Sequence, residues 1–124
     1  RGLQNKHGEM VQNYHYEDLK LLQSLYEERN LANPAVVVDT NHCNSGKQHR
    51  EQLRIAQEIM HSRKYSQELA NFVKGLMVES YLIEGACKVE EHIFGKSITD
   101  PCIGWEDTVR LISNVYEYEQ QTKY

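Results

Sequence analysis

Apolar positions recur along the chain with two different spacings, and these spacings predict the order of its elements. In residues 15–30 apolar side chains return every three or four positions with charged residues between them, which is typical of an amphipathic helix. The pair Asn33-Pro34 limits this helix, because the residue before a proline disfavours helical geometry. The same spacing in residues 47–61 and 105–118 predicts two further helices.

Two short apolar runs break the helical spacing and are interpreted as strands. Residues 34–40 contain three consecutive valines, and residues 73–78 read V-K-G-L-M-V. A continuous run of branched apolar residues suits a strand that is covered on both faces, as in a parallel sheet. Strands that alternate with helices favour a parallel α/β arrangement. Two strands alone make a poor sheet, so we expect missing strands or another copy of the chain to complete it.

The remaining segments show no clear period. Residues 1–13, 81–94 and 95–104 are interpreted as loops, and residues 119–124 as a frayed tail. Residues 63–71 are polar and fit either a helical extension or a loop.

Composition and charge restrict the class of protein. The 124 residues are about one small domain, and 40% apolar with 26% charged residues argues against disorder. A net charge of −4 gives no basic surface for nucleic acid, and no apolar run approaches the roughly 20 residues that cross a bilayer. The chain opens on Arg1-Gly2 without a signal peptide or an initiator methionine, which we interpret as a fragment of a longer protein. Because Cys43, Cys87 and Cys102 are odd in number and form no Cys-x-x-Cys pair, we expect a reducing, cytoplasmic compartment.

Residues 36–47 join a predicted strand to a predicted helix and carry polar, metal-capable side chains. In parallel sheets the chemistry lies just past the carboxyl ends of the strands, where His42 and Glu79 fall. Asp100 lies in the loop before the last predicted helix. One imidazole and two carboxylates suit a catalytic divalent metal. Spacing alone leaves the alternatives open: His42 could cap a helix, Glu79 could pair with a lysine, and Asp100 could be a turn residue.

Other candidate groups are open to two interpretations. Cys43 and Cys102 lie beside this site, and either is a soft metal ligand or a small packed residue. Lys47 either holds a substrate phosphate or is an ordinary exposed lysine, and Trp105 is expected to anchor the core. The remaining histidines have polar surroundings and are expected to be solvated: His7, His15, His49, His61 and His92.

Three segments resemble those of the class I 3-deoxy-D-arabino-heptulosonate 7-phosphate (DAHP) synthases. Residues 38–47, V-D-T-N-H-C-N-S-G-K, are similar to the family segment D-x-S-H-x-N-S-x-K. Residues 75–85 are similar to G-V-M-V-E-S-H-L-x-E-G, and residues 94–106 are close to the signature that ends in K-S-I-T-D-x-C-I-G-W-E. The three segments keep their order and spacing over nearly the whole chain, and they look most like the branch of feedback-regulated microbial enzymes.

The resemblance implies an α/β fold, namely the C-terminal part of a (β/α)8 TIM barrel from helix six to helix eight. It implies the condensation of phosphoenolpyruvate with erythrose 4-phosphate, which opens the shikimate pathway to aromatic amino acids. The family holds a divalent metal (Mn, Fe, Co or Zn) through a cysteine, a histidine, a glutamate and an aspartate. The last three map onto His42, Glu79 and Asp100, and Arg1 matches an arginine that contacts the phosphate of phosphoenolpyruvate.

The departures from the family pattern leave His42, Glu79 and Asp100 in place, but the chain lacks the family's cysteine ligand. The metal-binding cysteine belongs to the early part of the barrel, and Cys43 stands at a position of a small residue and does not replace it. Asn41 replaces a common serine and Pro101 a common alanine. We therefore expect the isolated chain to be inactive. The rival hypotheses are a non-catalytic fragment that folds and self-associates through exposed sheet edges, and a sugar-acid phosphate synthase with a related barrel.

Overall fold

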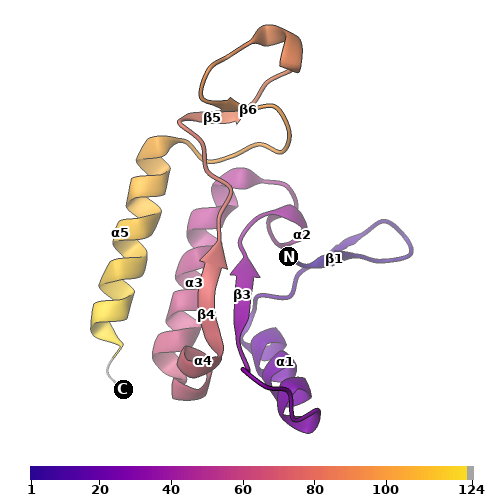
Figure 1. Cartoon of the computed structure of the whole chain (residues 1–124), viewed down its shortest axis with the longest axis vertical. Helices are drawn as coiled ribbons and strands as arrows, with labels where there is room; N and C mark the ends of the chain where they lie inside the picture. The colour runs from indigo at the N-terminus through magenta and orange to yellow at the C-terminus, as the bar shows by residue number, and fades with distance from the viewer. Residues whose placement is uncertain (123–124) are drawn as a thin grey trace.

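The centre of the fold is a pair of parallel strands, β3 (Val36–Asp39) and β4 (Val73–Met77) (Figure 1). Their register places Asp39 opposite Met77, so both strands end at the same edge. Both strands and their parallel pairing agree with the sequence-based prediction, and the chain is of mixed α/β composition. The structure, a computed structural model, describes residues 1–122. The crossover from β3 to β4 consists of α2 (His42–Ser45), the 3-10 helix η1 (His49–Glu51), α3 (Gln52–Tyr65) and α4 (Gln67–Phe72).

Two further helices flank the strand pair, α1 (Tyr16–Glu28) and α5 (Trp105–Gln121). α1 lies within the predicted residues. α5 is longer than predicted, so residues 119–121 are helical and their interpretation as a frayed tail is wrong; residues 123–124 lie outside the described residues. Trp105 heads α5 as expected but is 57% exposed, so it does not anchor the core. Over residues 1–122, no helix is both long enough and apolar enough to cross a bilayer.

The helix expected at residues 47–61 begins later than predicted, because α3 starts at Gln52 and runs to Tyr65. Gly46 and Lys47 have φ values of 60° and 61°, and consecutive left-handed residues end a right-handed helix. The chain therefore forms the short α2, a turn and η1 before α3 begins. The open question at residues 63–71 is also settled, because Ser66 ends α3 and its Oγ accepts a hydrogen bond from the Leu69 N–H, which starts α4.

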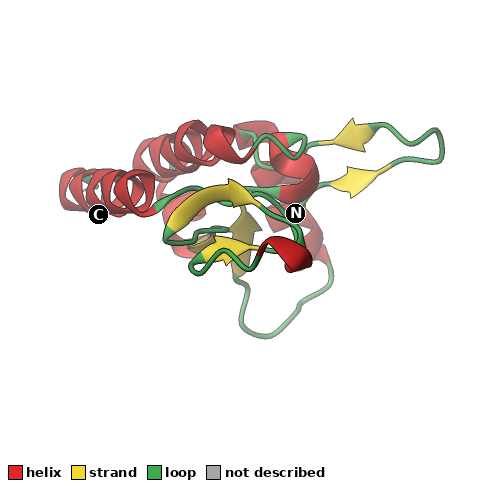
Figure 2. Ribbon diagram, turned by 90° about the horizontal axis from the view of Figure 1, so that it is seen from above, coloured by secondary structure: helices red, strands yellow, loops and turns green. Residues whose placement is uncertain are grey.

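The segments expected to be loops contain short strands, so those predictions are wrong in part. They are the antiparallel pair β1 (Leu3–Gln4) and β2 (Met10–Val11), and the parallel pair β5 (Ile83–Ala86) and β6 (Lys96–Ser97), with the 3-10 helix η2 (Val89–Glu91) between β5 and β6. The β1–β2 hairpin projects from the body of the molecule (Figure 2). Such strands are too short to show a period in the sequence; backbone hydrogen bonds to distant residues create them, such as that from Gly85 N to Cys102 O at 2.9 Å.

The main core lies on one side of the β3–β4 pair, against α1, α3 and α4. Its buried side chains are Tyr14, Leu19, Val38, Ile55, Ile59, Leu69, Phe72 and Val73. A second, smaller cluster of Ala56, Ile103 and Leu111 joins α3 to α5. The crossover helices thus cover one face of the sheet.

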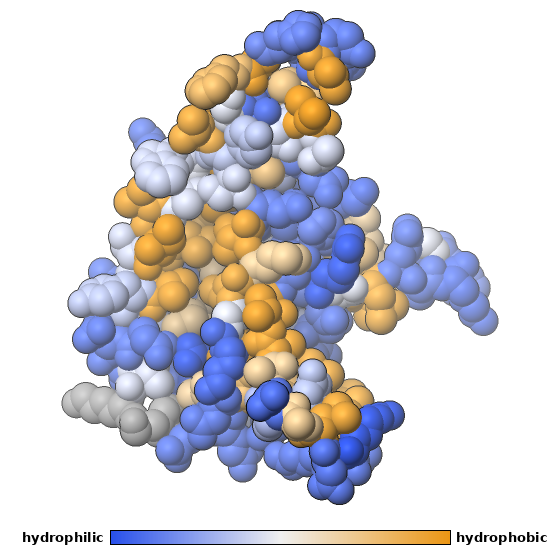
Figure 3. Space-filling view, in the orientation of Figure 1, coloured by the Kyte–Doolittle hydropathy of each residue, from blue (hydrophilic) through white to orange (hydrophobic). Residues whose placement is uncertain are grey.

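The opposite face of the strand pair is exposed. Val37 is 61% and Met77 46% exposed, whereas Val38, which points the other way, is 4% exposed. The expectation that the valine run is covered on both faces is therefore wrong for residues 1–122. Figure 3 shows apolar side chains gathered over β3, β4 and the adjoining side of α5, where Ile112 is 59% exposed.

Candidate metal centre

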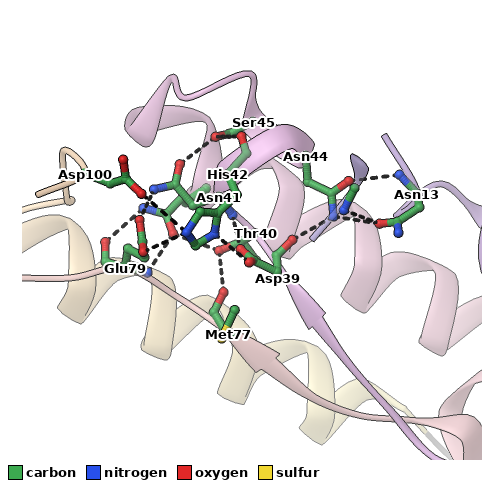
Figure 4. A network of polar contacts seen from close by, with 12 residues as sticks. Asn13, Asp39, Thr40, Asn41, His42, Asn44, Ser45, Met77, Glu79 and Asp100 are labelled. Atoms are coloured by element: carbon green, nitrogen blue, oxygen red, sulfur yellow. Dashed lines mark hydrogen bonds and ion pairs between the residues drawn. The ribbon is translucent and has the colours of Figure 1, made fainter. Parts of the chain in front are cut away.

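The three residues predicted as metal ligands come together at the carboxyl ends of β3 and β4 (Figure 4). His42 begins α2 just after β3, Glu79 follows β4, and Asp100 lies in the loop before α5. His42 Nε2 is 3.2 Å from Glu79 Oε1 and 3.4 Å from Asp100 Oδ2. One ligand atom from each residue lies within 4.8 Å of the other two. Residues far apart in the sequence thus direct their donor atoms to one point.

Asp39 orients the imidazole of His42. Asp39 Oδ2 lies 2.7 Å from His42 Nδ1, and an ionised carboxylate only accepts hydrogen bonds. Nδ1 therefore donates its proton to Asp39, and in the neutral ring the lone pair of Nε2 faces Glu79 and Asp100. A carboxylate behind a ligand histidine is the usual arrangement that fixes its tautomer in metal sites.

The donor atoms fit a divalent cation. Three lone-pair donors that face each other repel unless a positive charge lies between them. Bonds of about 2.1 Å to nitrogen and oxygen ligands imply roughly 3.0–3.4 Å between neighbouring donors, as found around His42 Nε2. The side chain of His42 is 17% exposed and that of Asp100 41%, so the site is anchored on one side and open to a substrate on the other.

The backbone of His42 carries local strain. Its φ of 50° lies in the left-handed region, which non-glycine residues seldom adopt. Such residues persist where the surrounding structure holds them, and they concentrate at functional sites. The turn at His42 lets α2 begin directly after β3, which brings the imidazole over the strand end.

Gln52 ties the ends of the two strands together. Its side chain is fully buried; Oε1 accepts hydrogen bonds from Glu79 N and Thr40 Oγ1, each at 2.9 Å, and Nε2 donates to Glu79 O at 2.9 Å. The amide thus pairs with the Glu79 backbone as a neighbouring strand would. Sequence reasoning missed Gln52, although a glutamine in register with the buried Ile55 and Ile59 of α3 was a usable signal.

A second series of hydrogen bonds joins the amino-terminal residues to the site. Asn44 Nδ2 donates to Asp39 O at 2.8 Å and to Asn13 Oδ1 at 2.9 Å, and Asn13 Oδ1 also accepts from Gly2 N at 2.9 Å. Gly2 has a φ of 67°, and a Cβ there would lie 2.7 Å from a backbone oxygen. The predicted substrate ligand Arg1 is exposed and sits next to this anchored glycine, near α2.

The other candidates at the site do not join the ligand group. Among the described residues, the ligand atoms that lie within 4.8 Å of one another belong to His42, Glu79 and Asp100, and Cys43 is not part of this group. Burial raises the pKa of the Cys102 thiol, whose Sγ donates to the Asp100 carbonyl at 3.4 Å. Cys102 is therefore a small packed residue with a neutral thiol, and not a soft metal ligand.

Two histidines that were expected to be solvated have acidic partners. His15 is exposed as expected, whereas the side chain of His49 is 21% exposed, so the expectation is wrong for His49. His15 Nδ1 lies 2.6 Å from Glu58 Oε1, and His49 Nε2 lies 2.9 Å from Glu84 Oε1. Glu84 also receives two hydrogen bonds from the Arg50 guanidinium. Arg50, and then His49, lower the pKa of Glu84 to about 2. This ionic cluster fastens β5 to η1, and thereby holds the segment between Glu79 and Asp100.

The sequence model of the DAHP synthetase I family matches residues 4–113. The chain belongs to this family. The resemblance seen in the three sequence segments is thereby confirmed, and the ligand group lies in the part that matches.

Curated relatives in the DAHP synthetase I family give the same result. The Trp-sensitive phospho-2-dehydro-3-deoxyheptonate aldolase of Shigella flexneri is 41% identical over 107 residues, which are 83% of this chain and 29% of that protein. Its counterpart in Escherichia coli (strain K12) is 38% identical over 106 residues, with the same coverage. The chain thus spans 29% of the length of these relatives.

A solved structure supports the fold. The phospho-2-dehydro-3-deoxyheptonate aldolase of Francisella tularensis SCHU S4 superposes with a TM-score of 0.82 at 27% identity. The match covers 90% of this chain and 32% of that protein. The α/β arrangement of β3, β4 and their helices is therefore one that this larger enzyme also contains.

Proposed function

We propose that the chain supplies the metal-holding part of a DAHP synthase. The enzyme condenses phosphoenolpyruvate with erythrose 4-phosphate to DAHP and phosphate in the cytoplasm, as the first step of the shikimate pathway to aromatic amino acids. The observation that carries this proposal is the convergence of His42, Glu79 and Asp100 in a chain of the DAHP synthetase I family. The relatives' printed names support the same reaction.

The chain corresponds, in this proposal, to the C-terminal part of a (β/α)8 barrel. β3 and β4 are strands seven and eight, α1 is helix six, and α5 is helix eight. The exposed face of Val37, Gly75 and Met77 supports this, because the interior face of a barrel is covered only when the other strands close it. The coverage of under a third of the relatives points the same way.

His42, Glu79 and Asp100 would hold a divalent metal, with the fourth, cysteine ligand coming from the remainder of the barrel. A bound Mn, Fe, Co or Zn ion supplies Lewis-acid polarisation of the aldehyde oxygen of erythrose 4-phosphate. His42 presents Nε2 because Asp39 holds the proton on Nδ1. Two carboxylates balance the charge of the cation, and the exposed side of Asp100 leaves room for substrate.

Arg1 would bind the phosphate of phosphoenolpyruvate. A guanidinium recognises phosphate through two parallel hydrogen bonds. The hydrogen bonds that link Gly2 to Asn13 and Asn13 to Asn44 support this role, because they hold the backbone beside Arg1 against the helix that carries His42.

Replacing His42 tests the proposal. In the full-length protein that carries this segment, we expect chelator to abolish phosphate release from the two substrates and added metal to restore it. His42→Ala should reduce the rate by at least about a hundredfold, since metal polarisation contributes several kcal/mol. His61→Ala, an exposed histidine of α3, is the matched control and should behave as the unchanged protein. Chelator-resistant activity, or a fully active His42→Ala protein, contradicts the assignment.

A second candidate is a non-catalytic module that self-associates. The apolar side chains exposed over β3, β4 and α5 favour it, because monomers seldom expose large apolar patches. Light scattering of the 124-residue chain measures the assembly directly. A dimer or larger homo-oligomer supports this candidate, and a clean monomer excludes it.

A further inference from the structure

The buried side chain of Asn41 touches all the elements that carry the proposed ligands (Figure 4). It is 2% exposed, and its Nδ2 donates to Glu79 Oε2 at 2.5 Å and to the Pro101 carbonyl at 3.4 Å. Its Oδ1 accepts a hydrogen bond from Ser45 Oγ at 2.5 Å. One amide thus connects α2, the end of β4 and the residue that follows Asp100.

The orientation of this amide is specified. The ionised Glu79 carboxylate and the Pro101 carbonyl only accept hydrogen bonds, so the NH₂ end must face them, and Oδ1 is left to accept from the Ser45 hydroxyl. The backbone N–H of Asn41 donates to Asp39 Oδ1 at 2.8 Å, while the other oxygen of Asp39 accepts from His42. A single carboxylate therefore places both the imidazole of His42 and the backbone of Asn41.

The two oxygens of Glu79 have different partners. Oε1 lies 3.2 Å from His42 Nε2 and belongs to the ligand group, whereas Oε2 is held by Asn41. We propose that Asn41 is a positioning residue that restricts Glu79 to a single metal-binding oxygen and fixes its distance from the Asp100 segment. The inference deepens the metal centre proposed above and rests on it.

Serine, the residue common at this position in the resembling segment, has one hydroxyl donor. It cannot donate to Glu79 and to the Pro101 carbonyl at once, as the two N–H groups of Asn41 do. The hydroxyl oxygen is also bonded to Cβ, one bond nearer the backbone than Nδ2, so it lies farther from Glu79, and Asn41→Ser should free Oε2 to bind the metal as a second oxygen.

Titration of the metal-free 124-residue chain with Co²⁺ tests the inference, because the visible absorption of Co²⁺ reports its coordination number. In Asn41→Ser we expect the bands to weaken and move to shorter wavelength as Glu79 becomes bidentate. Affinity should fall about tenfold, the usual loss when a residue behind a ligand is removed. Bands identical to those of the unchanged chain overturn the inference, whatever the affinity.

Three further variants separate the possible causes. Asn71→Ser, at an exposed position of α4, is the matched control and should leave the bands unchanged. Ser45→Ala removes the hydrogen bond to Asn41 Oδ1 and so loosens the amide; it should shift the bands in the same direction but less, which keeps the test valid if circular dichroism shows Asn41→Ser to be unfolded. His42→Ala should abolish Co²⁺ binding; if it binds as the unchanged chain does, the metal centre itself is wrong.

A metal-independent measurement decides the case in which no protein binds Co²⁺. The side-chain amide signal of Asn41 is identified in nitrogen-15 NMR spectra by its loss in Asn41→Ser. We expect it to exchange with solvent at least about tenfold more slowly than the exposed amide of Asn71. Equal exchange rates overturn the positioning role.

Discussion

Two regions of this molecule are equally buried but held by different forces. In the core beneath β3 and β4, Ile59, Leu69 and Val73 are at most 1% exposed and pack without directional bonds. At the carboxyl ends of the same strands, Gln52 and Asn41 are at most 2% exposed and are held by hydrogen bonds of 2.5–2.9 Å. Apolar packing decides which elements are neighbours, whereas the hydrogen bonds decide where individual ligand atoms lie.

This difference has a consequence for mutation. A core accepts changes that keep its volume, because packing is not directional. A buried polar network does not, because each lost partner leaves a desolvated donor or acceptor. Core variants should therefore alter stability without altering the metal centre, and network variants should alter both.

The largest expected effect comes from the core. Ile59→Ala removes a fully buried side chain of α3 and should lower the free energy of unfolding by about 2–5 kcal/mol. Urea denaturation measures the loss, and Leu21→Ala, at a 62% exposed position of α1, is the control. The Co²⁺ spectrum of Ile59→Ala should remain unchanged below the unfolding transition. A changed spectrum would break the separation of the two regions.

Gln52→Leu should lower the free energy of unfolding less than Ile59→Ala does, but it should disturb the metal centre more. The change keeps most of the volume but leaves Glu79 N–H without its acceptor, at a cost of about 1–3 kcal/mol. Because the Glu79 backbone is no longer fixed, Co²⁺ binding should weaken as well. Gln57→Leu, at an exposed position of the same helix, should change neither quantity. Unaltered Co²⁺ binding in Gln52→Leu would contradict the positioning role of the network.

The smallest effect is expected at the exposed ionic cluster. Glu84→Gln removes the ion pair with Arg50, whose side chain is 74% exposed, and should cost less than about 1 kcal/mol near neutral pH. Arg50 and His49 lower the pKa of Glu84 from 4.5 to about 2. Because the folded pKa is depressed, this stabilisation is present above the ordinary pKa and is lost as the pH falls from about 4.5 to about 2.

Unfolding midpoints measured across this pH range check whether the stabilisation by Glu84 is lost on acidification. The unchanged chain should lose more stability than Glu84→Gln on acidification, and the exposed control Glu90→Gln should behave as the unchanged chain. Parallel acid dependence of all three proteins would show that Glu84 contributes nothing.

Much of the framework was predictable from local patterns. The three- and four-residue spacing predicted α1 because it marks the buried side of a helix, and the valine run predicted β3 because branched residues favour a strand. The polar residues after β3 and β4 marked the site, because parallel strands bring their carboxyl ends to one edge.

Other features were decided only by the tertiary structure. The β1–β2 and β5–β6 pairs are too short to show a period, and the break before α3 depends on left-handed turns at Gly46 and Lys47. Whether Val37 is covered depends on what packs against it, which its own neighbours in sequence do not specify.

The candidate metal centre, which begins in residues 36–47, was likewise determined in part by the sequence and in part by the tertiary structure. The sequence by itself determined that His42 follows a strand and that two carboxylates follow later. Only the tertiary structure decided that Asp39 fixes the tautomer of His42 and that Asn41 holds one oxygen of Glu79. A hydrogen bond depends on the distance and direction between atoms from separate elements, and residue spacing along the chain does not encode either quantity.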